Sequence, residues 1–405
     1  MTRVLFVIHF PVFGGPHNQA LRLAKPLAKR GFDTVVVVPD QDGNAAERLG
    51  AAGLNVRSIG LHRLRATRDL RAHLGLAAHA PAEIRRLRAL IRAEHISIVQ
   101  IGGLVNPHAA IAARLERVPV VWQLLDTRAP RAVAAAAMVF VRMFADVVMS
   151  TGLGTAKAHP GYSAIADRLI PFFPPVDLEE FAPNPELRID VRDSWGVSAD
   201  DVVVGCVANI NPQKGIVELV RAFNEARSRT RERRLVLVLV GAEYPQHATY
   251  SALVRRQMTE EGLTEGHDVI LAGERADIER QLVGMDVFAL AAAPRSEGVT
   301  TSVLEAMAAG LPIVVNDVGA LCEAVTDGLT GFVVPVGDTT GFGLALARLV
   351  ADPDLRSTMG EAAHRLARAS FGIDACADAH VRAYVRAIAA RGIRNPRASR
   401  SGPSV

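Results

Sequence analysis

The chain has 405 residues, of which 49% are hydrophobic and 22% are charged, and its formal net charge is +4. This composition is ordinary for a globular enzyme with room for two or three domains, and it excludes a largely disordered chain. The small net charge imposes no nucleic-acid-binding surface, so no nucleic-acid partner is expected. Three scattered cysteines, Cys206, Cys322 and Cys376, are too few for a disulfide framework or a metal cluster, and reduced structural thiols are expected.

The first residues predict a buried strand rather than an export signal. Val4–Ile8 is apolar, but it lacks the longer apolar region and the cleavage site of a signal peptide, so a cytoplasmic protein is expected. The most apolar helical run, Ala132–Val141, is interrupted by Arg142 and Asp146. Because about 20 apolar residues are needed to span a bilayer, no transmembrane helix is expected.

Short β-branched runs alternate with helical ones through the first half of the chain. A glycine-rich turn, Phe13–Pro16, leads into a helix over His17–Lys29, which Gly31 closes. Continuous apolar runs are typical of strands that are buried on both faces of a parallel sheet. The expected strands are Val4–Ile8, Thr34–Pro39, Ile96–Ile101, Val118–Leu124 and Asp146–Ser150.

Arginines cluster between residues 63 and 92, and the second part of the cluster has an apolar stripe opposite its basic residues. One interpretation is an ordinary surface helix whose stripe faces the core. The other is an interfacial helix that contacts acidic lipid and makes the protein peripheral at the inner membrane face. The arginines are Arg63, Arg65, Arg68, Arg71, Arg85, Arg86, Arg88 and Arg92, and the stripe is Ile84, Leu87, Leu90 and Ile91.

A proline-dense segment, Ile170–Asp177, stops regular structure and marks a boundary or hinge before a second series of strands. We expect an α/β protein with two Rossmann-like, doubly wound parallel-sheet domains that face a cleft, where open α/β folds bind ligands. The expected divisions are 1–175 and 176–370 for the domains, 371–392 for a helix that packs back across the hinge, and 393–405 for a disordered tail. The expected strands of the second domain are Val202–Asn209, Leu235–Val240, Val269–Ala272, Val287–Ala291, Ile313–Asn316 and Gly331–Val334.

The segment Pro294–Pro312 places two carboxylates, Glu297 and Glu305, across a turn into a helix. A carboxylate that accepts two vicinal sugar hydroxyls forms charge-assisted hydrogen bonds, which are roughly twice as strong as neutral ones. Lys214 stands at the start of a helix over Ile216–Arg227, where a diphosphate would find a cation and free backbone N–H groups. Together these residues indicate a site for a nucleotide sugar.

Five segments, in this order, carry a family resemblance: Phe13-Gly14-Gly15 with Leu23–Gly31, Phe173–Phe181, Asn211–Gly215, Glu297–Glu305, and Asp317–Pro335. The double-glycine turn alone is weak evidence, whereas the ordered set is strong. On these segments the chain resembles a retaining GT-B glycosyltransferase of glycosyltransferase family 4, the glycosyl transferases group 1, over nearly its whole length.

The resemblance implies a role for each matched residue. Lys214 and Glu297 would be the catalytic residues, with Lys214 neutralising the departing diphosphate and Glu297 gripping hydroxyls of the donor sugar. Glu305 would accept the ribose hydroxyls. Backbone N–H groups of the remaining donor-binding residues would approach the diphosphate or the sugar, and domain closure would complete the site. These residues are Gly14, Gly15, Gly298, Val299 and Thr300.

The chain departs from the family pattern at two positions. The family usually has an arginine where this chain has Asn209, which is still expected among the donor-binding residues, so Lys214 acts alone as the phosphate cation or another basic residue such as Arg275 substitutes. The family commonly has a histidine where this chain has Leu125. The remaining candidates for sugar or acceptor contacts are His17, His108 and Asp126, although both histidines also suit the start of a helix.

The expected reaction is a front-face transfer in which the acceptor hydroxyl attacks while it is hydrogen-bonded to the leaving diphosphate, so no enzyme base is compulsory. A UDP- or GDP-sugar is the expected donor, and no cofactor is expected. Asp40-Gln41-Asp42 could be mistaken for a metal-binding motif, but it follows the second strand, and we predict a loop there and no metal requirement.

Several alternatives stay open. A nicotinamide dehydrogenase would also be doubly wound, but the turn at Gly14-Gly15-Pro16 lacks the spaced glycine fingerprint. A sugar-nucleotide epimerase, a phosphorylase or a catalytically degenerate GT-B scaffold would fit the same architecture. The expected acceptor is a lipid-linked or envelope saccharide, with a small hydrophobic metabolite as the alternative. The sequence does not predict an oligomeric state.

Overall fold

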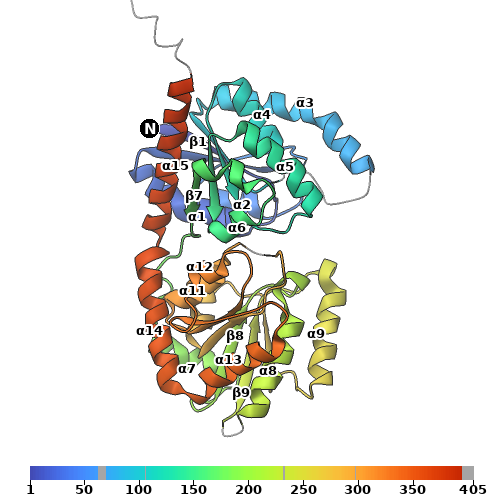
Figure 1. The fold of residues 1–405 in the computed structure, drawn as a ribbon, viewed down its shortest axis with the longest axis vertical. Helices are drawn as coiled ribbons and strands as arrows, with labels where there is room; N and C mark the ends of the chain where they lie inside the picture. Colours follow the sequence, from blue (N-terminus) through green and yellow to red (C-terminus); the bar gives the residue numbers. More distant parts are fainter. Residues whose placement is uncertain (63–69, 105, 231–232, 297, 395–405) are drawn as a thin grey trace, which may run out of the picture. The chain divides into compact units, whose positions relative to one another are not determined.

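The computed structural model describes residues 1–62, 70–104, 106–230, 233–296 and 298–394. Its chain divides into two compact units, of which the first comprises Met1–Pro175 with Ile373–Val405 and the second comprises Val176–Gly372. Each unit is a parallel sheet with helices packed against it (Figure 1). The last helix therefore belongs with the first unit, although the chain reaches it only after completing the second.

Seven parallel strands of the first unit pair in the order β3-β2-β1-β4-β5-β6-β7. The order reverses between β1 and β4, as it does in doubly wound folds, because successive crossovers run first to one side and then to the other. The β-branched runs of the central strands are buried on both faces, which is why they are apolar throughout. The strands are β1 (Thr2–Ile8), β2 (Phe32–Pro39), β3 (Asn55–Ile59), β4 (Ile98–Gly102), β5 (Val120–Leu124), β6 (Val147–Thr151) and β7 (Leu169–Phe172).

Helices cover both faces of this sheet. The core on one face includes side chains of α3, α4 and α5, and the other face packs against α1, α2 and α15. Among the helices of the described residues, none combines the length and the apolar character needed to cross a bilayer. The helices are α1 (Gly15–Lys29), α2 (Ala45–Ala51), α3 (Leu70–Ala93), α4 (Pro107–Leu115), α5 (Arg131–Phe144), α6 (Leu153–Lys157) and α15 (Ile373–Arg394), with short 3-10 turns at Tyr162–Ala164 and Ala166–Arg168.

The apolar stripe of the basic segment faces the core. Leu87 and Ile91 are buried in the cluster that fills this side of the sheet, and Ile84 and Leu90 pack against it. The interfacial interpretation of this helix is therefore corrected: its apolar side chains are already used by the domain. Of the basic residues, Arg63, Arg65 and Arg68 lie outside the described residues, as does the side chain of Arg71, whereas Arg88 and Arg92 both pair with Glu116.

Two edge strands of the first sheet were not expected. The proline-dense segment does form a strand, β7, in which Pro171 stands opposite Ser150 of β6. Because β7 is the last strand, the missing N–H of Pro171 breaks no further ladder. At the other edge, β3 (Asn55–Ile59) is half-buried and carries Arg57 and Ser58, so no apolar run marks it.

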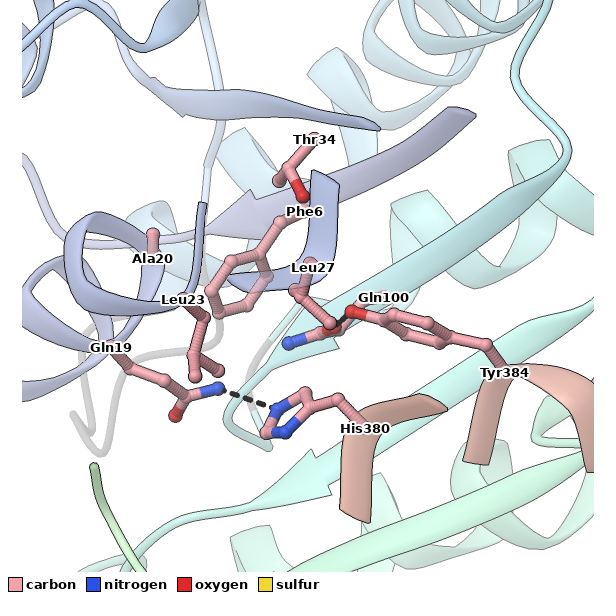
Figure 2. A pocket seen from close by; sticks show the side chains of 9 residues that line it. All are labelled: Phe6, Gln19, Ala20, Leu23, Leu27, Thr34, Gln100, His380 and Tyr384. Carbon is pink, nitrogen blue, oxygen red and sulfur yellow. Dashed lines mark hydrogen bonds between the residues drawn. The ribbon is translucent and has the colours of Figure 1, made fainter. Parts of the chain in front are cut away.

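A buried polar network attaches α15 to the first sheet (Figure 2). The His380 ring donates from Nδ1 to the Cys376 carbonyl at 2.8 Å. Its Nε2 accepts from the amides of Gln19 at 2.9 Å and Gln123 at 3.0 Å. The Tyr384 hydroxyl donates to the side chain of Gln100. These bonds lie beside a cavity of about 10 Å³, enough for about one water molecule, so the helix is held by specific polar contacts as well as by its apolar face.

Burial of His380 predicts a stability that depends on pH. Burial lowers the pKa of His380 from 6.5 to about 4. Between these values an unfolded chain binds more protons at this position than the folded one, so the contribution of His380 to the free energy of unfolding of the first unit should fall as the pH decreases from 6.5 towards 4. Substitution His380→Gln should reduce the pH dependence, of which buried His17 supplies a further part.

The measurement is urea unfolding at a series of pH values, followed by the fluorescence of Trp122, which is buried in the first unit. The chain has only two tryptophans, so a Trp195→Phe background leaves Trp122 as the sole reporter. His247→Gln, at a half-buried position in the second unit, is the control. Equal pH slopes in the His380→Gln chain and its parent would contradict the assignment.

Six parallel strands of the second unit pair in the order β10-β9-β8-β11-β12-β13. Their positions agree closely with the apolar runs of the sequence. The strands are β8 (Val202–Val207), β9 (Leu235–Val240), β10 (Val269–Gly273), β11 (Val287–Leu290), β12 (Ile313–Asn316) and β13 (Gly331–Val334). The helices are α7 (Pro185–Ser194), α8 (Ile216–Arg229), α9 (Ala248–Glu260), α10 (Ile278–Val283), α11 (Thr301–Ala308), α12 (Leu321–Ala324), α13 (Thr339–Ala351) and α14 (Pro353–Ser370), with 3-10 turns at Pro212–Lys214 and Pro245–His247.

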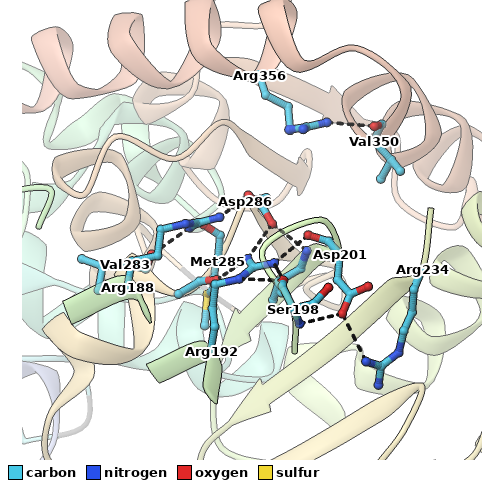
Figure 3. A network of polar contacts seen from close by, with 12 residues as sticks. Arg188, Arg192, Ser198, Asp201, Arg234, Val283, Met285, Asp286, Val350 and Arg356 are labelled. Atoms are coloured by element: carbon cyan, nitrogen blue, oxygen red, sulfur yellow. Dashed lines mark hydrogen bonds and ion pairs between the residues drawn. The ribbon is translucent and has the colours of Figure 1, made fainter. Parts of the chain in front are cut away.

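An arginine network fixes the amino ends of the two central strands (Figure 3). Arg188 and Arg192 of α7 contact the Asp286 carboxylate at 2.5 and 3.1 Å, just before β11. The same carboxylate accepts the Val203 N–H of β8 at 2.8 Å. The network therefore holds β8 and β11 in register at the edge of the sheet opposite their carboxyl ends.

Candidate functional site

The second sheet has its topological switch between β8 and β11. These strands are neighbours, with Val204 opposite Val287, but they are the first and fourth strands of the unit. Crossovers on either side of such a pair leave the sheet in opposite directions, which opens a crevice at the carboxyl ends where doubly wound folds bind ligands. The chain leaves β8 through the segment that ends at Lys214, and it leaves β11 through the segment that leads to α11.

Close backbone packing fixes the loop that carries Lys214. The Asn211 side chain accepts the Gln213 N–H at 3.0 Å and caps the 3-10 turn that ends at Lys214. Gly215 follows with φ +60°, and a Cβ built there would lie 1.8 Å from the carbonyl oxygen of Ala291. Only glycine allows both this conformation and this approach of the two loops. Burial raises the pKa of Cys206 in β8 to about 12, and the charge of half-buried Lys214 is near enough to oppose that effect.

The loop after β11 is tied to the loop after β8 and to the next loop along the sheet. The Ala293 N–H donates to the Gln213 carbonyl at 3.0 Å, and the Ser302 hydroxyl donates to the Val207 carbonyl at 2.9 Å. The Gly298 carbonyl accepts the Ala320 N–H at 3.2 Å. Nothing in the sequence pattern had singled out Ser302, which joins the start of α11 to the end of β8.

The predicted donor-binding residues of this unit meet at the switch point. Gly298, Val299 and Thr300 are buried and immediately precede α11, whose positive N-terminal end therefore lies at the crevice. Glu305 lies one turn into this helix and is 8% exposed. Glu297 lies outside the described residues. The structure thus brings Lys214, the segment before α11 and Glu305 to one edge of the sheet.

The two residues considered in place of the family arginine are both engaged elsewhere. Asn209 is exposed after β8, and its side chain accepts the Ala242 N–H at 3.1 Å, which links the loops after β8 and β9. Arg275 follows β10, and its guanidinium forms two bonds of 2.9 Å with the carboxylate of Asp277. This pairing lowers the pKa of Asp277. Of the three residues considered for this role, Lys214 is thus the one whose side chain these contacts do not tie to a neighbouring loop or carboxylate.

The residues predicted in the first unit also gather at the carboxyl edge of its sheet. Gly14 and Gly15 form the start of α1 after β1, His108 is in the first turn of α4 after β4, and Asp126 follows β5. These three strands are neighbours in the order β1-β4-β5. The side chain of Asp126 pairs with Arg128 at 2.8 Å and is partly exposed.

His17 serves the local structure of the double-glycine turn. Its ring accepts the Gly14 N–H at 3.1 Å through Nδ1 and donates from Nε2 to the Phe10 carbonyl at 3.0 Å. The side chain is fully buried, and burial lowers its pKa from 6.5 to about 4, so the neutral ring is the stable form. Both ring nitrogens are occupied, and His17 therefore acts as a helix-start residue in this structure.

His108 belongs to a buried pair that no sequence pattern indicated. Its Nδ1 lies 2.9 Å from a carboxylate oxygen of Glu83, which is 2% exposed and comes from α3. Burial lowers the pKa of His108, and the charge of Glu83 opposes the effect. The other carboxylate oxygen faces His62, whose ring stacks on that of His79 with centroids 4.4 Å apart. His62 and His108 are 21 and 25 residues from Glu83 in the chain, and the packing of α3 on α4 brings His108 to this carboxylate.

Comparison with known proteins identifies the family. The model of the family "Glycosyl transferases group 1" matches residues 188–366, and that of the "Glycosyl transferase 4-like domain" matches residues 14–159. The GDP-mannose-dependent alpha-(1-6)-phosphatidylinositol monomannoside mannosyltransferase of Mycolicibacterium smegmatis is 30% identical over 299 residues, which cover 70% of this chain and 74% of that protein. The chain belongs to the group 1 glycosyl transferases. It is a glycosyltransferase, and the epimerase and scaffold alternatives are not favoured.

Other relatives of this glycosyltransferase match over a smaller region. The D-inositol 3-phosphate glycosyltransferase of Kribbella flavida is 34% identical over 219 residues, which cover 52% of this chain and 49% of that protein. The match thus spans about half the length of this relative. The Kribbella and Mycolicibacterium relatives are named for different acceptors, so membership of the family does not by itself identify the acceptor.

Solved structures confirm the GT-B fold of the glycosyltransferase. Anabaena HepE in complex with UDP has a TM-score of 0.78 at 21% identity, covering 94% of this chain and 99% of that chain. Sucrose-phosphate synthase from Thermosynechococcus elongatus has a TM-score of 0.72 at 18% identity, covering 96% of this chain and 100% of that chain. Within the residues that the structure describes, no His, Cys, Asp and Glu side chains are grouped as metal ligands. Independence of metal stays a prediction.

Proposed function

We propose that this glycosyltransferase moves a sugar from a nucleoside-diphosphate sugar, bound at the β8–β11 switch point, to an acceptor hydroxyl with retention of the anomeric configuration. The observation that carries the proposal is the meeting of Lys214, the buried segment Gly298–Thr300 and Glu305 at one sheet edge. A cation, a helix N-terminus and a nearby carboxylate are the partners that a diphosphate and a ribose require.

The residue roles follow from the charge that develops in the reaction. The leaving diphosphate gains negative charge as the bond to the sugar breaks. Lys214 and the N–H groups before α11 are held by the backbone contacts around Gly215 and Ser302, so they stabilise this charge without reorganising. Glu305 accepts the ribose hydroxyls, and Glu297 accepts hydroxyls of the donor sugar. The contacts of Gly14 and Gly15 with phosphate stay a prediction.

The donor and acceptor classes are suggested by the relatives. The Mycolicibacterium relative is named for GDP-mannose and a phosphatidylinositol mannoside, and HepE is solved with UDP. We therefore propose a UDP- or GDP-sugar as donor, without a metal, and a lipid-linked saccharide as acceptor. A small hydrophobic metabolite is the alternative acceptor.

Thermal unfolding with a nucleotide panel tests the donor site. UDP, GDP, ADP, CMP and NAD are each added at about 100 times the expected dissociation constant, where a bound ligand stabilises the fold by about 2.7 kcal/mol. A selective rise of a few degrees with one nucleoside diphosphate is expected. A rise with NAD alone, or none with any nucleotide, would contradict the proposal.

Two glutamate variants separate nucleotide binding from sugar transfer. Glu305→Ala should weaken binding of the selected nucleotide, because the ribose loses a charged acceptor. Glu297→Ala should abolish transfer while nearly preserving nucleotide affinity, because its partner is the sugar. Calorimetric titration and product formation measure the two effects. Glu361→Ala, at an exposed position of α14, is the control, and equal, negligible effects of both glutamate variants would exclude these roles.

A further inference from the structure

The outer face of α5 is apolar although it is exposed. Met143 is 58% exposed and Val139 is 49% exposed, and Ala132, Ala135 and Ala136 are exposed on the same side of the helix. The inner face, with Ala137, Met138 and Val141, already fills the core. A surface helix normally presents polar side chains to water, so a helix that is apolar on both faces lacks a partner on its outer one.

The patch continues beyond α5. Leu115 at the end of α4 is 54% exposed, and the Arg114 side chain of the same turn donates to the Met143 carbonyl at 3.2 Å, so the ends of the two helices lie together. Phe140 and Phe144 are partly exposed and stack with centroids 6.1 Å apart. We call Leu115, Ala132, Ala135, Ala136, Val139 and Met143 the α5 patch.

Basic side chains border the α5 patch. Arg131 and Arg142 lie on α5 itself, and Arg117 follows Leu115; all three are exposed, and none pairs with a carboxylate among the described residues. The carboxylates near the α5 patch are already paired with other arginines. Glu116 is held by Arg88 and Arg92, which lower its pKa to about 2, and Asp146 is buried beside Arg114.

This charge is local to one region of the chain. Residues 78–157 contain ten lysines and arginines and five aspartates and glutamates, a net charge of +5, whereas the whole chain has +4. Helices α3, α4 and α5, which carry most of these residues, pack in series on one face of the first sheet (Figure 1).

We propose that the α5 patch docks the enzyme on a membrane surface rich in anionic phospholipid. Val139, Met143 and Leu115 insert among the acyl chains at the headgroup boundary, while Arg117, Arg131 and Arg142 contact lipid phosphates. A second copy of this chain is a poorer occupant, because a symmetric interface would bring the same unpaired arginines together. This docking does not depend on the donor site, and it differs from the earlier expectation for residues 63–92 because α5, rather than α3, supplies the apolar side chains.

Vesicle co-sedimentation of the full chain tests the proposal. Phosphatidylcholine vesicles with and without phosphatidylglycerol are compared, and binding is expected only with the anionic lipid. Val139→Gln with Met143→Gln should weaken binding about tenfold or more, because two partly inserted apolar side chains are lost. Arg131→Gln with Arg142→Gln should weaken it about fivefold for each charge, since a basic residue near an anionic surface contributes about 1 kcal/mol.

The matched control is Ile189→Gln with Leu253→Gln, which replaces apolar side chains of the second unit that are 65% and 45% exposed. This control should not change vesicle binding. Thermal unfolding and the nucleotide-induced shift of every variant should equal those of the parent, so a lost lipid interaction is distinguished from a lost fold or donor site. Binding that survives the Val139/Met143 change would overturn the proposal. The proposal would also be overturned if the parent chain did not bind anionic vesicles and instead formed a dimer, measured by light scattering, that the Val139/Met143 change dissociates.

Discussion

Replacing Lys214 with alanine is expected to lower kcat/KM for sugar transfer by about 10²–10³-fold. Removal of one fixed group that stabilises charge in a transition state typically has this effect. Lys214 is held at the switch point by the Asn211 cap and by the contact of Gly215 with Ala291, so its charge is placed before the donor binds. Asn209 replaces the family arginine and Arg275 is paired with Asp277, so neither of these residues would compensate for the lost charge.

Steady-state kinetics with the nucleotide sugar selected by the thermal panel measure this loss. Lys29→Ala, at an exposed position near the end of α1, removes the same charge from the other unit and should change kcat/KM little. Lys214→Arg should retain part of the activity, because it keeps the charge. An unimpaired Lys214→Ala enzyme would exclude the assigned role and would direct attention to other groups at the edge.

Gly215→Ala is expected to lower the free energy of unfolding of the second unit by about 2–5 kcal/mol. A left-handed conformation costs a residue with a side chain roughly 1–2 kcal/mol, and overpacking typically adds about 1–3 kcal/mol. The added Cβ would lie 1.8 Å from the backbone oxygen of Ala291, so the loops after β8 and β11 must separate. Nucleotide binding should weaken as well, because these loops carry the donor site.

Gly262→Ala measures the conformational part of this effect alone, so the difference between the two variants gives the steric part. Gly262 has φ +67°, close to the +60° of Gly215, but nothing lies within 4 Å of a Cβ built there. It should lose only the conformational part, about 1–2 kcal/mol, and keep nucleotide affinity. Urea unfolding followed by Trp195 in a Trp122→Phe background reports on the second unit alone. Equal losses in both variants would show that the loops do not approach as the structure describes.

The strands of the second unit were predictable because each is a continuous apolar run. Leu235–Val240 and Ile313–Asn316 have the expected bounds because they are buried throughout, and the short apolar run Gly331–Val334 at the edge of the sheet also has the expected bounds. The edge strands of the first unit were not predictable in this way. Asn55–Ile59 is half-exposed and polar, and Leu169–Phe172 contains a proline that only an edge position tolerates.

The candidate site was predictable in composition but not in its supporting contacts. Lys214, Gly298–Thr300 and Glu305 follow strands whose carboxyl ends meet in any doubly wound sheet, so the pattern indicated their proximity. Ser302, whose hydroxyl reaches the end of β8 some 95 residues away, could not be found from local sequence. The same holds for Glu83 beside His108, because both contacts depend on which helix packs on which strand.

The sequence by itself determined the α/β class, the parallel direction of the buried strands and the family, because periodicity and ordered motifs are local properties of the chain. Only the tertiary structure decided which apolar helix faces are buried and which stay exposed. It turned the stripe of α3 towards the core and left the outer face of α5 exposed, although both segments read as apolar helices. It also placed His380 of the last helix beside Gln19 of α1 and Gln123 of β5. The physical reason is that burial and partner choice depend on contacts between residues far apart in the chain, which no local pattern contains.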